Sequence, residues 1–383
     1  MTKLEELIQK LCPNGVEHKP LNEVSEMKRG TSITKKDIVE GEIPVVSGGR
    51  EPAYYCDKYN RDGETITVAG SGAGAGYVQY WTKPIFVCDA FSIQGNPGIQ
   101  TKYIYYFLTN IQDYIYSTKK GGGVPHVHIS SIQNVSVPVP PLPVQREIVR
   151  ILDNFTELTA ELTAELTARK KQYAYYRDKL LSTNNSSVPV VELRDIVKKS
   201  CSGATPAKGN AEYYENGTIP WIRTQDVRFN EITEVNSYIT EKAVSETATK
   251  WIPENCVIVA ISGATAGRCA INKIKATTNQ HCLNLIIDDS MALYRYVFHC
   301  LCSKYEELIS RKQGARGDLN SSLILSLPIS IPSLEVQKRL VEVLDNFDAI
   351  CSDLKIGLPA EIEARQKQYE YYRDKLLTFT PAD

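Results

Sequence analysis

The sequence predicts an α+β fold that consists of two tandem copies of one unit, each made of a mixed domain and a long helix. A long segment occurs twice in the chain, which indicates a duplication. Its apolar residues are spaced alternately three and four apart, which is typical of paired helices. The intervening stretches contain short β-rich runs, such as Thr65–Ala69 and Cys256–Ile261, and a helical run at Tyr294–Gln313. Each domain is therefore expected to mix strands with helices.

The repeat has two well-matched anchors. The first is QREIVRILDNF at Gln145–Phe155, which recurs as QKRLVEVLDNF at Gln337–Phe347, 192 positions further along. The second is KQYAYYRDKLL at Lys171–Leu181, which recurs as KQYEYYRDKLL at Lys367–Leu377, 196 positions further along. The second copy therefore holds four more residues between its anchors, and matches of this length do not arise by chance.

Both anchors belong to long predicted helices with an apolar face. In the second copy the apolar positions follow the spacing of a coiled-coil seam. Pro359 interrupts this copy, and we expect the helix to kink or restart there. The residues predicted to form the coiled-coil or subunit interface are Ile151, Phe155, Leu158, Leu162, Tyr173, Tyr176, Leu180, Val343, Phe347, Ile350, Leu354, Tyr369, Tyr372 and Leu376. An ordinary two-helix core would explain the apolar spacing but neither the duplication nor the difference in length.

The first copy also contains a short internal repeat, Thr-Ala-Glu-Leu, at 159–162 and 163–166. Four residues advance ~400° around an α-helix, so one unit more or less rotates the apolar face by only ~40°. The length of the helix changes by ~6 Å at the same time. The repeat is therefore suited to act as an adjustable spacer.

The domains that precede the two helices are related only by short islands. The clearest is VAGSGAGAG at Val68–Gly76, which matches VAISGATAG at Val259–Gly267. A polar break at Asn184–Ser187 starts the second unit. We predict four parts: a first domain over 1–144 with a short amphipathic N-terminal helix, a central helix over 145–183, a second domain over 184–335 and a C-terminal helix over 336–383.

Composition excludes several classes of protein. Hydrophobic residues make up 42% of the 383 residues and charged residues 23%, which favours a folded chain over a disordered one. No run approaches the ~18 apolar residues of a membrane span, and the N-terminus lacks the apolar core of a signal peptide. The ten cysteines include no C-x-x-C pair, and no cluster of histidine and cysteine has zinc-ribbon spacing. We therefore expect a cytoplasmic protein with reduced thiols, no membrane contact and no bound metal.

Together these features resemble the specificity subunit of type I restriction–modification systems over essentially the whole chain. The resemblance rests on the two repeated helices, the Thr-Ala-Glu-Leu units and the Gly203–Pro206 and Ile219–Ile222 segments that open the second domain. It implies two target-recognition domains, each of which recognises one half of a bipartite, asymmetric site in double-stranded DNA. It also implies that the two helices form an antiparallel coiled coil with pseudo-twofold symmetry, which sets the domain spacing.

The resemblance further implies partners. The helices of such a subunit bind two methyltransferase (modification) subunits, and restriction (translocase) subunits then join the complex. The subunit itself is a non-catalytic scaffold without a cofactor. This agrees with the sequence, which lacks the signatures of an adenine methyltransferase and of a Walker A loop.

For DNA contacts we select polar and basic residues on irregular segments. In the second domain these are Arg223–Asp226, which follow an apolar run, and a basic loop at 311–320. In the first domain the aligned basic loop is Lys119–His126, and Ser47–Arg50 is a second candidate. The predicted contacts are Ser47, Gly49, Arg50, Lys119, Lys120, Gly122, His126, Arg223, Thr224, Gln225, Asp226, Arg311, Lys312, Gln313, Arg316 and Asn320. For any one of them, an exposed and solvated side chain is an equally good interpretation.

Two other functions are weighed against DNA recognition. Val68–Gly76 mimics a dinucleotide-binding motif, because its glycines follow a strand and Asp89 lies about 20 residues on. This would support an S-adenosylmethionine-binding methyltransferase, but Tyr77–Trp81 is a predicted strand where that motif requires a helix. A tight loop that brings the backbone close to another segment is favoured. The remaining alternative is a purely structural coiled-coil scaffold.

The charge of the chain bears on its expected affinity for DNA. The net charge is −1, with 44 Lys and Arg against 45 Asp and Glu. Within residues 1–144 the two kinds of charge balance, and within 185–333 the excess is a single positive charge. Phosphate neutralisation supplies much of the affinity for DNA, so near-neutral domains are expected to bind weakly without partner subunits.

Overall fold

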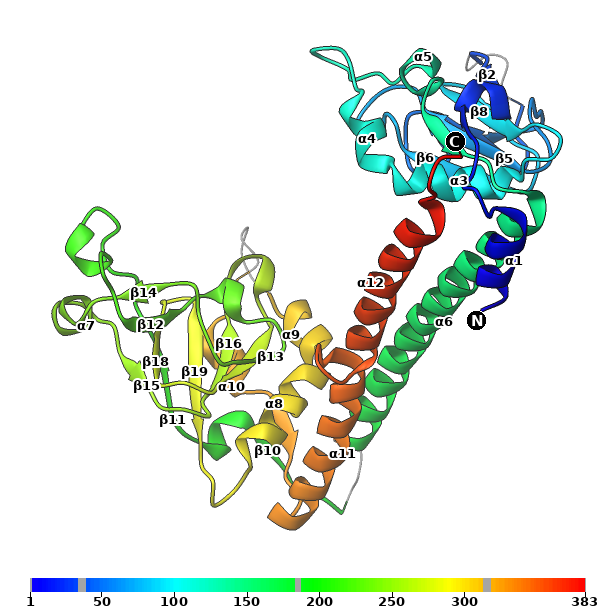
Figure 1. Ribbon diagram of the computed structural model, residues 1–383. Coiled ribbons are helices and arrows are strands. Elements are labelled where there is room, and N and C mark those ends of the chain that lie inside the picture. The colour runs from blue at the N-terminus through cyan, green and yellow to red at the C-terminus, as the bar shows by residue number, and fades with distance from the viewer. Residues whose placement is uncertain (1, 34–38, 183–186, 313–317, 383) are drawn as a thin grey trace. The chain divides into compact units, whose positions relative to one another are not determined.

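The computed structural model describes residues 2–33, 39–182, 187–312 and 318–382. The chain forms two compact units, Met1–Thr163 with Glu361–Asp383, and Ala164–Ala360. Each unit contains one mixed domain together with a segment of helix α6 and a segment from the C-terminal helices (Figure 1). In the described ranges, no helix combines the length and the apolar character that a membrane span requires.

The first unit contains a four-stranded and a three-stranded sheet. The four-stranded sheet has the order β2-β8-β5-β6 and is antiparallel throughout, whereas in the second sheet, β4-β3-β7, strands β3 and β7 are parallel. Its elements are α1 (Lys3–Leu11), β1 (His18–Pro20), α2 (Leu21–Val24), β2 (Ser25–Arg29), β3 (Ile43–Val46), β4 (Tyr54–Cys56), β5 (Thr65–Ala69), β6 (Val78–Trp81), β7 (Phe86–Val87), β8 (Ala90–Gly95), α3 (Thr101–Asn110), α4 (Gln112–Ser117), α5 (Ile129–Ile132) and β9 (Ser136–Pro138).

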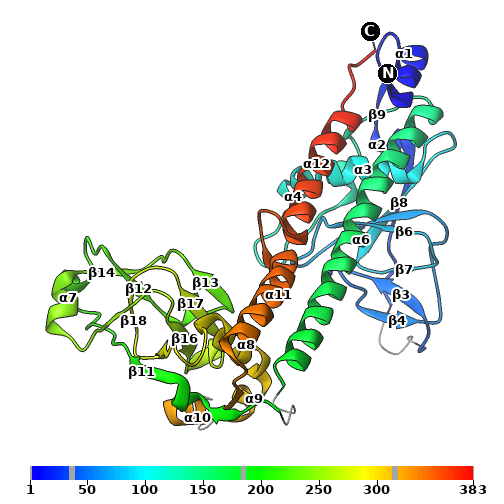
Figure 2. The same cartoon turned by 90° about the horizontal axis from the view of Figure 1, so that it is seen from below.

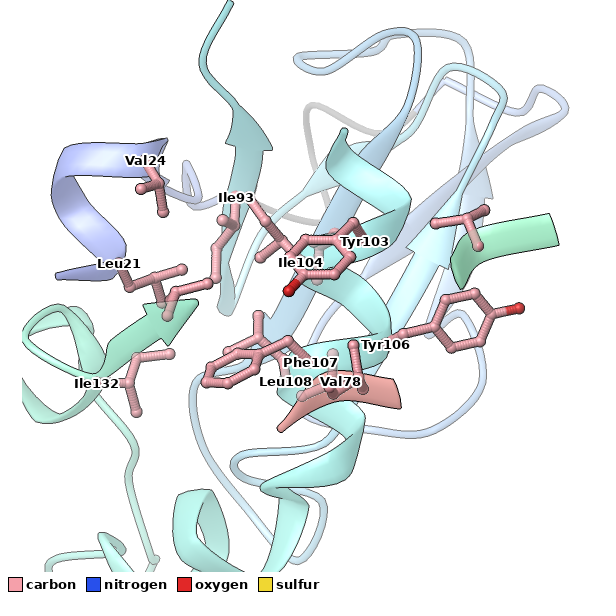
Figure 3. Packing of buried hydrophobic residues seen from close by; sticks show 14 of the residues in the cluster. Leu21, Val24, Val78, Ile93, Tyr103, Ile104, Tyr106, Phe107, Leu108 and Ile132 are labelled. Atoms are coloured by element: carbon pink, nitrogen blue, oxygen red, sulfur yellow. The ribbon is translucent and has the colours of Figure 1, made fainter. Parts of the chain in front are cut away.

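The core of the first unit lies between helix α3 and the four-stranded sheet. Figure 3 shows the apolar side chains gathered around α3, including Ile104 and Leu108, which are fully buried. Burial of one such side chain contributes roughly 1.5–3 kcal/mol. The hydroxyl of the buried Tyr103 donates a hydrogen bond to the carbonyl oxygen of Pro138 at 3.0 Å, which ties α3 to β9. The helix is thereby fixed on the sheet by packing and by one buried polar contact.

The second unit repeats this plan with additional edge strands. The sheet β11-β19-β16-β17-β13 corresponds to the four-stranded sheet, and β14-β12-β18-β15 corresponds to the three-stranded one. Its elements are β10 (Val190–Glu192), η2 (Leu193–Ile196), β11 (Val197–Ser202), η3 (Ala211–Tyr213), β12 (Ile219–Ile222), η4 (Thr224–Asp226), β13 (Asn230–Ile232), β14 (Tyr238–Ile239), α7 (Glu241–Glu246), β15 (Trp251–Ile252), β16 (Val257–Ala260), η5 (Gly263–Thr265), β17 (Cys269–Asn272), β18 (Ala276–Thr278), β19 (Cys282–Ile287), α8 (Tyr294–Ser303), α9 (Tyr305–Ser310), α10 (Ser321–Leu325) and β20 (Pro328–Ser330).

Individual contacts confirm that the two units are equivalent. Helix α8 occupies the place of α3, and the hydroxyl of Tyr296 donates to the carbonyl oxygen of Ser330 at 2.8 Å, as Tyr103 does to Pro138. The parallel pairing of β3 with β7 recurs as that of β12 with β18. The α+β fold with a tandem repeat is therefore confirmed, although the two domains share only short islands of sequence.

The structure contains the predicted long helices and the predicted interruption of the second one near Pro359. Helix α6 (Leu142–Leu180) runs for 39 residues, which corresponds to about 58 Å. Helix α11 (Leu334–Ser352) ends before Pro359, and α12 (Leu358–Leu377) begins just ahead of it. Proline is tolerated in the first turn of a helix, where its missing N–H has no intrahelical acceptor. The expected restart is thus observed.

Within each unit, one half of α6 packs against an antiparallel neighbour, α12 in the first unit and α11 in the second (Figures 1 and 2). The rings of Phe155 and Tyr372 stack with centroids 5.6 Å apart in the first unit. In the second unit the rings of Tyr176 and Phe347 lie 6.5 Å apart. The repeat relates Phe155 to Phe347 and Tyr176 to Tyr372, so the same contact is made with the two helices exchanged. Each unit therefore contains the helix–helix contact that an antiparallel coiled coil of repeated helices requires.

A charged cluster connects α8 to α11 in the second unit. Asp345 accepts hydrogen bonds from Nε2 of His299 at 2.7 Å and from Nε of Arg295 at 2.5 Å. Partial burial raises the pKa of the Asp345 carboxyl, but the hydrogen bonds from His299 and Arg295 outweigh it and hold the pKa below its usual value. In the first unit, Asp153 accepts from Lys102 and Tyr106 at the equivalent place.

We expect Asp345→Asn to lower the free energy of unfolding by about 2 kcal/mol at pH 7, because charge-assisted hydrogen bonds are lost. A carboxyl whose pKa is lowered by folding stabilises the folded state above its unfolded pKa of about 3.9, and this stabilisation is lost as the pH falls through the folded pKa. The difference in free energy of unfolding between wild type and Asp345→Asn should therefore shrink below about pH 4. Urea unfolding over a pH series measures it, with Glu342→Gln on the exposed face of α11 as control. A difference that does not depend on pH would contradict this role.

Candidate nucleic-acid interface

The glycine-rich segment between β5 and β6 is a tight hairpin loop. Strand β5 pairs antiparallel with β6, with Val68 opposite Val78. Gly72 and Gly76 have φ values of 79° and 85°, which side chains rarely adopt. The amide of Gly76 donates to the carbonyl oxygen of Ala69 at 2.8 Å and closes the loop. The predicted tight loop is confirmed, and the segment lacks the strand–helix connection of a dinucleotide-binding motif.

The second unit contains the same loop between β16 and β17. Gly263 and Gly267 have φ values of 72° and 90°. The amide of Gly267 donates to the carbonyl oxygen of Ala260 at 2.8 Å, and that of Ala266 donates to Gly263 at 3.1 Å. The matching bond in the first unit runs from Ala75 to Gly72, also at 3.1 Å. The short repeated island therefore specifies one backbone conformation twice.

Two segments that the sequence suggested separately meet at the loop of the first unit. A Cβ atom on Gly48 would lie 2.2 Å from the carbonyl oxygen of Ser71, so the Ser47–Arg50 segment lies directly against the loop. On the other side, the amide of Gly72 donates to the carbonyl oxygen of Pro125 at 3.0 Å. Lys120 and His126 exchange backbone hydrogen bonds of 2.9 and 2.8 Å. We call residues 47–50, 70–76 and 119–127 the first loop cluster.

The first loop cluster presents cationic side chains and a glycine-rich tip to solvent. The guanidinium of Arg50 lies over the ring of Tyr77, 5.0 Å from its centroid, and the ammonium of Lys119 lies 4.3 Å from that of Tyr116. Lys120 and His126 are exposed, as is the tip at 121–123, which includes Gly122. Within the described part of the chain, no carboxylate lies within 4.0 Å of the charged nitrogens of Arg50, Lys119 or Lys120. The cluster is therefore suited to an anionic polymer.

The second unit assembles an equivalent set, which we call the second loop cluster: 223–226, 261–267, 311–312 and 318–320. Arg223–Asp226 follows β12 as Ser47–Arg50 follows β3, and η4 lies against η5. The amide of Leu319 donates to the carbonyl oxygen of Ile261 at 2.8 Å, as that of Val127 does to Gly70 at 3.0 Å. Two predicted contacts, Gln313 and Arg316, lie outside the described residues.

Three predicted contacts of the second unit have partners within the chain. The carboxylate of Asp226 accepts from the amide of Arg223 at 2.8 Å, and the side chain of Asn320 caps α10 by accepting from the amide of Leu323 at 2.9 Å. Arg311 forms an ion pair with Glu307. Thr224 and Lys312 are half-buried and Gln225 is exposed. Contact of these residues with DNA stays a prediction.

Sequence reasoning missed the residues that hold the clusters together. Gly74 lies so close to Gly48 that a Cβ would stand 2.3 Å from its carbonyl oxygen, and Tyr77 and Trp221 support arginine side chains. The Ile-Pro pair that begins both β3 and β12 is a match visible in the sequence, and it relates Ser47–Arg50 to Arg223–Asp226.

The helices expose much of the predicted interface. Ile151, Phe155, Tyr372 and Leu376 line a groove of about 1080 Å³ in the first unit, between α1, α6, α12 and the C-terminal segment. Of the remaining predicted residues, Leu158, Leu162, Tyr173, Phe347 and Tyr369 are half-buried, whereas Tyr176, Leu180, Val343, Ile350 and Leu354 are exposed.

The seam predicted on α11 differs from the face that this helix buries. Val343 and Leu354 are 50% and 73% exposed, whereas Val341, Leu344 and Cys351 are buried. Helix α11 has two apolar faces. The domain core covers the face that carries Val341 and Leu344, and Gln337 is buried on the same side of the helix. The outward face keeps its predicted interface role as a prediction.

The described residues show no metal-binding group. No set of three or more His, Cys, Asp or Glu side chains in the described ranges is arranged to hold an ion. All ten cysteines are free thiols, and most are buried.

Comparison with known proteins places these observations in a family context. The family model described as the type I restriction modification DNA specificity domain matches residues 13–169 and 185–364. The specificity subunit of the type I restriction enzyme EcoR124I/EcoR124II of Escherichia coli is 39% identical over 291 residues, which cover 73% of this chain and 70% of that subunit. A putative type I restriction enzyme specificity subunit of Haemophilus influenzae is 29% identical over 401 residues, 99% of each chain.

Solved structures show the same fold. The S subunit of a type I restriction–modification system from M. genitalium superposes with a TM-score of 0.60 at 17% identity, covering 94% of this chain and 96% of that one. The HsdS subunit from Thermoanaerobacter tengcongensis gives a TM-score of 0.52 at 16% identity, covering 96% and 97%.

Proposed function

Because the chain belongs to the type I restriction–modification DNA specificity family, we propose that each of its units recognises one half of a bipartite, asymmetric sequence in double-stranded DNA. As a specificity subunit, the chain works with other restriction–modification subunits and with DNA. Nothing in the loops and helices that the structure describes favours the alternative of an S-adenosylmethionine-dependent methyltransferase, since the glycine-rich loop connects two antiparallel strands.

One observation carries the proposal: two loop clusters share a backbone frame but differ in side chains. The loops at 70–76 and 261–267 have matching hydrogen bonds and positive φ values. Beside them lie Ser47–Arg50 in one unit and Arg223–Asp226 in the other, which have no residue type in common at aligned positions. A common frame with different base-contacting groups suits a site whose two halves differ.

The side chains divide between two roles in binding. Lys119 and Lys120 in the first unit and Lys312 in the second supply charge for phosphate oxygens, which fixes position on the duplex without specifying sequence. Polar groups such as Ser47, Gln225 and the arginines supply hydrogen bonds to base edges. The glycine tips permit close approach of the backbone to the sugar–phosphate chain.

We further propose that the helices set the spacing of the half-sites and bind two modification subunits. The exchanged contacts Phe155–Tyr372 and Tyr176–Phe347 create two related surfaces, which suits two copies of one partner. Restriction (translocase) subunits then join this complex in the cytoplasm. The chain itself contributes no catalytic group and needs no cofactor.

Selection from random duplexes tests the proposal. We expect the complex of this chain with modification subunits to enrich two fixed segments separated by an unspecified gap. The isolated chain should bind the enriched duplex weakly and with strong salt dependence, since its domains are near neutral. Binding of S-adenosylmethionine by the isolated chain in calorimetry would favour the methyltransferase alternative. A complex that enriches no sequence would support a purely structural scaffold.

A further inference from the structure

Both loop clusters contain an arginine that lies over an aromatic ring beside equivalent strands. Arg50 lies in the loop after β3, with its guanidinium carbon 5.0 Å from the centroid of Tyr77. Arg223 directly follows β12, with its guanidinium carbon 5.7 Å from the centroid of Trp221. The two arginines occupy different positions in their loops and lie over different kinds of ring, yet the arrangement of guanidinium and ring is the same in two divergent domains.

In the part of the chain that the structure describes, the guanidinium groups of these two arginines form no hydrogen bond or ion pair with the rest of the chain, although each lies over a ring. Arg61, by comparison, donates to Ser92 and to two backbone carbonyl oxygens, and Arg295 is held by Asp345 and Glu231. Within the described ranges, neither Arg50 nor Arg223 has a carboxylate within 4.0 Å. The Nε atom of Arg223 is buried and finds no partner among the described residues.

The surroundings hold both arginines in place. The carbonyl oxygen of Arg50 accepts a hydrogen bond from the side chain of Gln79 on β6. The neighbouring Gly48 packs against Ser71, which leaves the loop little freedom. Trp221 is itself fixed, since its indole N–H donates to the carbonyl oxygen of Ala204 at 3.2 Å. A guanidinium stacked on a fixed ring loses less conformational freedom when it binds.

We propose that Arg50 and Arg223 each recognise a guanine in the major groove, one in each half of the target, with Tyr77 and Trp221 as positioning residues. This rests on the proposed function of the chain. The planar fork of an arginine matches O6 and N7 of guanine, and this pair discriminates strongly between bases. Phosphate oxygens need no such orientation, and the lysines nearby can supply charge for them.

The test uses the complex of the full chain with modification subunits and the duplex that this complex selects. Each guanine is replaced in turn by 7-deazaguanine, which lacks the N7 acceptor. With wild-type chain, one replacement in each half should weaken binding about 10-fold to 100-fold. With Arg50→Gln, the natural duplex should bind more weakly by a similar factor, and the replacement in one half should have no further effect. Arg223→Gln should do the same for the other half only.

Further variants separate the roles. Arg50→Lys and Arg223→Lys keep the charge but not the fork, and should not restore the dependence on N7. Tyr77→Phe keeps the stacking ring and should behave as wild type, whereas Tyr77→Leu should reduce the guanine dependence. Circular dichroism melting of each variant shows that the domain remains folded, and Lys120→Gln is a control that should weaken all duplexes equally.

Several results would overturn the inference. A selected target without guanine in one half excludes it for that half. A uniform loss of affinity in Arg50→Gln, with the sensitivity to 7-deazaguanine intact, would assign Arg50 to a phosphate, and no change at all would make it a solvated charge. If the wild-type complex selects no bipartite sequence, the proposed function itself fails.

Discussion

Insertion of one Thr-Ala-Glu-Leu unit after Leu166 is expected to lengthen the unspecified gap of the target by about one base pair and to leave both half-sites unchanged. Four added residues extend α6 by ~6 Å and rotate its face by only ~40°. That extension corresponds to between one and two base pairs of duplex rise. The loop clusters are untouched, so the bases that they recognise should stay the same.

The structure explains why the helix should accept this insertion. The boundary between the two compact units falls between Thr163 and Ala164, inside the second of the two four-residue repeats. From 159 to 166, all of which the structure describes, every side chain is exposed or half-buried. The last buried residue of α6 is Leu152. Lengthening this stretch therefore disturbs no domain core.

Sequencing of modified bases in a host that carries the insertion measures the effect. An insertion of only two residues is the matched control, because it rotates the helix by ~200° and should abolish modification. An unchanged gap, or an altered half-site, would contradict the role of the repeat as a spacer.

The second large effect is expected from Gln337→Met, which should lower the free energy of unfolding by about 3 kcal/mol. Gln337 is completely buried. Its Oε1 accepts from the amide of Leu293 at 2.9 Å, and its Nε2 donates to the carbonyl oxygens of Met291 and Pro332 at 3.1 and 2.9 Å. Methionine fills a similar volume but leaves these partly buried backbone groups without their side-chain partner.

The repeat provides a matched variant. Gln145 accepts from the amide of Gln100 at 2.9 Å and donates to Gly98 and Pro140 at 3.3 and 2.8 Å. We expect Gln145→Met to destabilise the first unit to a similar extent, and Gln366→Met, at an exposed position of α12, to have little effect. Urea unfolding followed by circular dichroism compares them. A loss below about 1 kcal/mol for both buried variants would contradict the account of these contacts.

These glutamines also illustrate what sequence reasoning can predict. The repeat, the long helices, the restart at Pro359 and the tight loop at 70–76 follow from local spacing and residue type, and the structure confirms each. That Gln145 and Gln337 begin both anchors was visible in the sequence. Glutamine is suited to this position because its side chain forms hydrogen bonds with a loop that is distant in the sequence. Only the folded chain reveals these bonds.

The candidate interface was predictable to a lesser degree. Ser47–Arg50 and Lys119–His126 were selected for composition, yet their meeting at the glycine loop depends on contacts between segments more than 20 residues apart. Asn320 and Asp226 were selected for the same polar character that makes them good caps, because a capping side chain and a base-contacting one use the same atoms. On α11, two apolar faces were present, and spacing alone did not show which one the core covers.

The central claim, two equivalent units that recognise two different half-sites, is tested most directly by sequencing the modified bases of a host that expresses this chain with modification subunits. We expect one asymmetric motif of two fixed segments separated by a gap of constant length. A single contiguous motif, a palindromic one, or modified bases without a common sequence would contradict it.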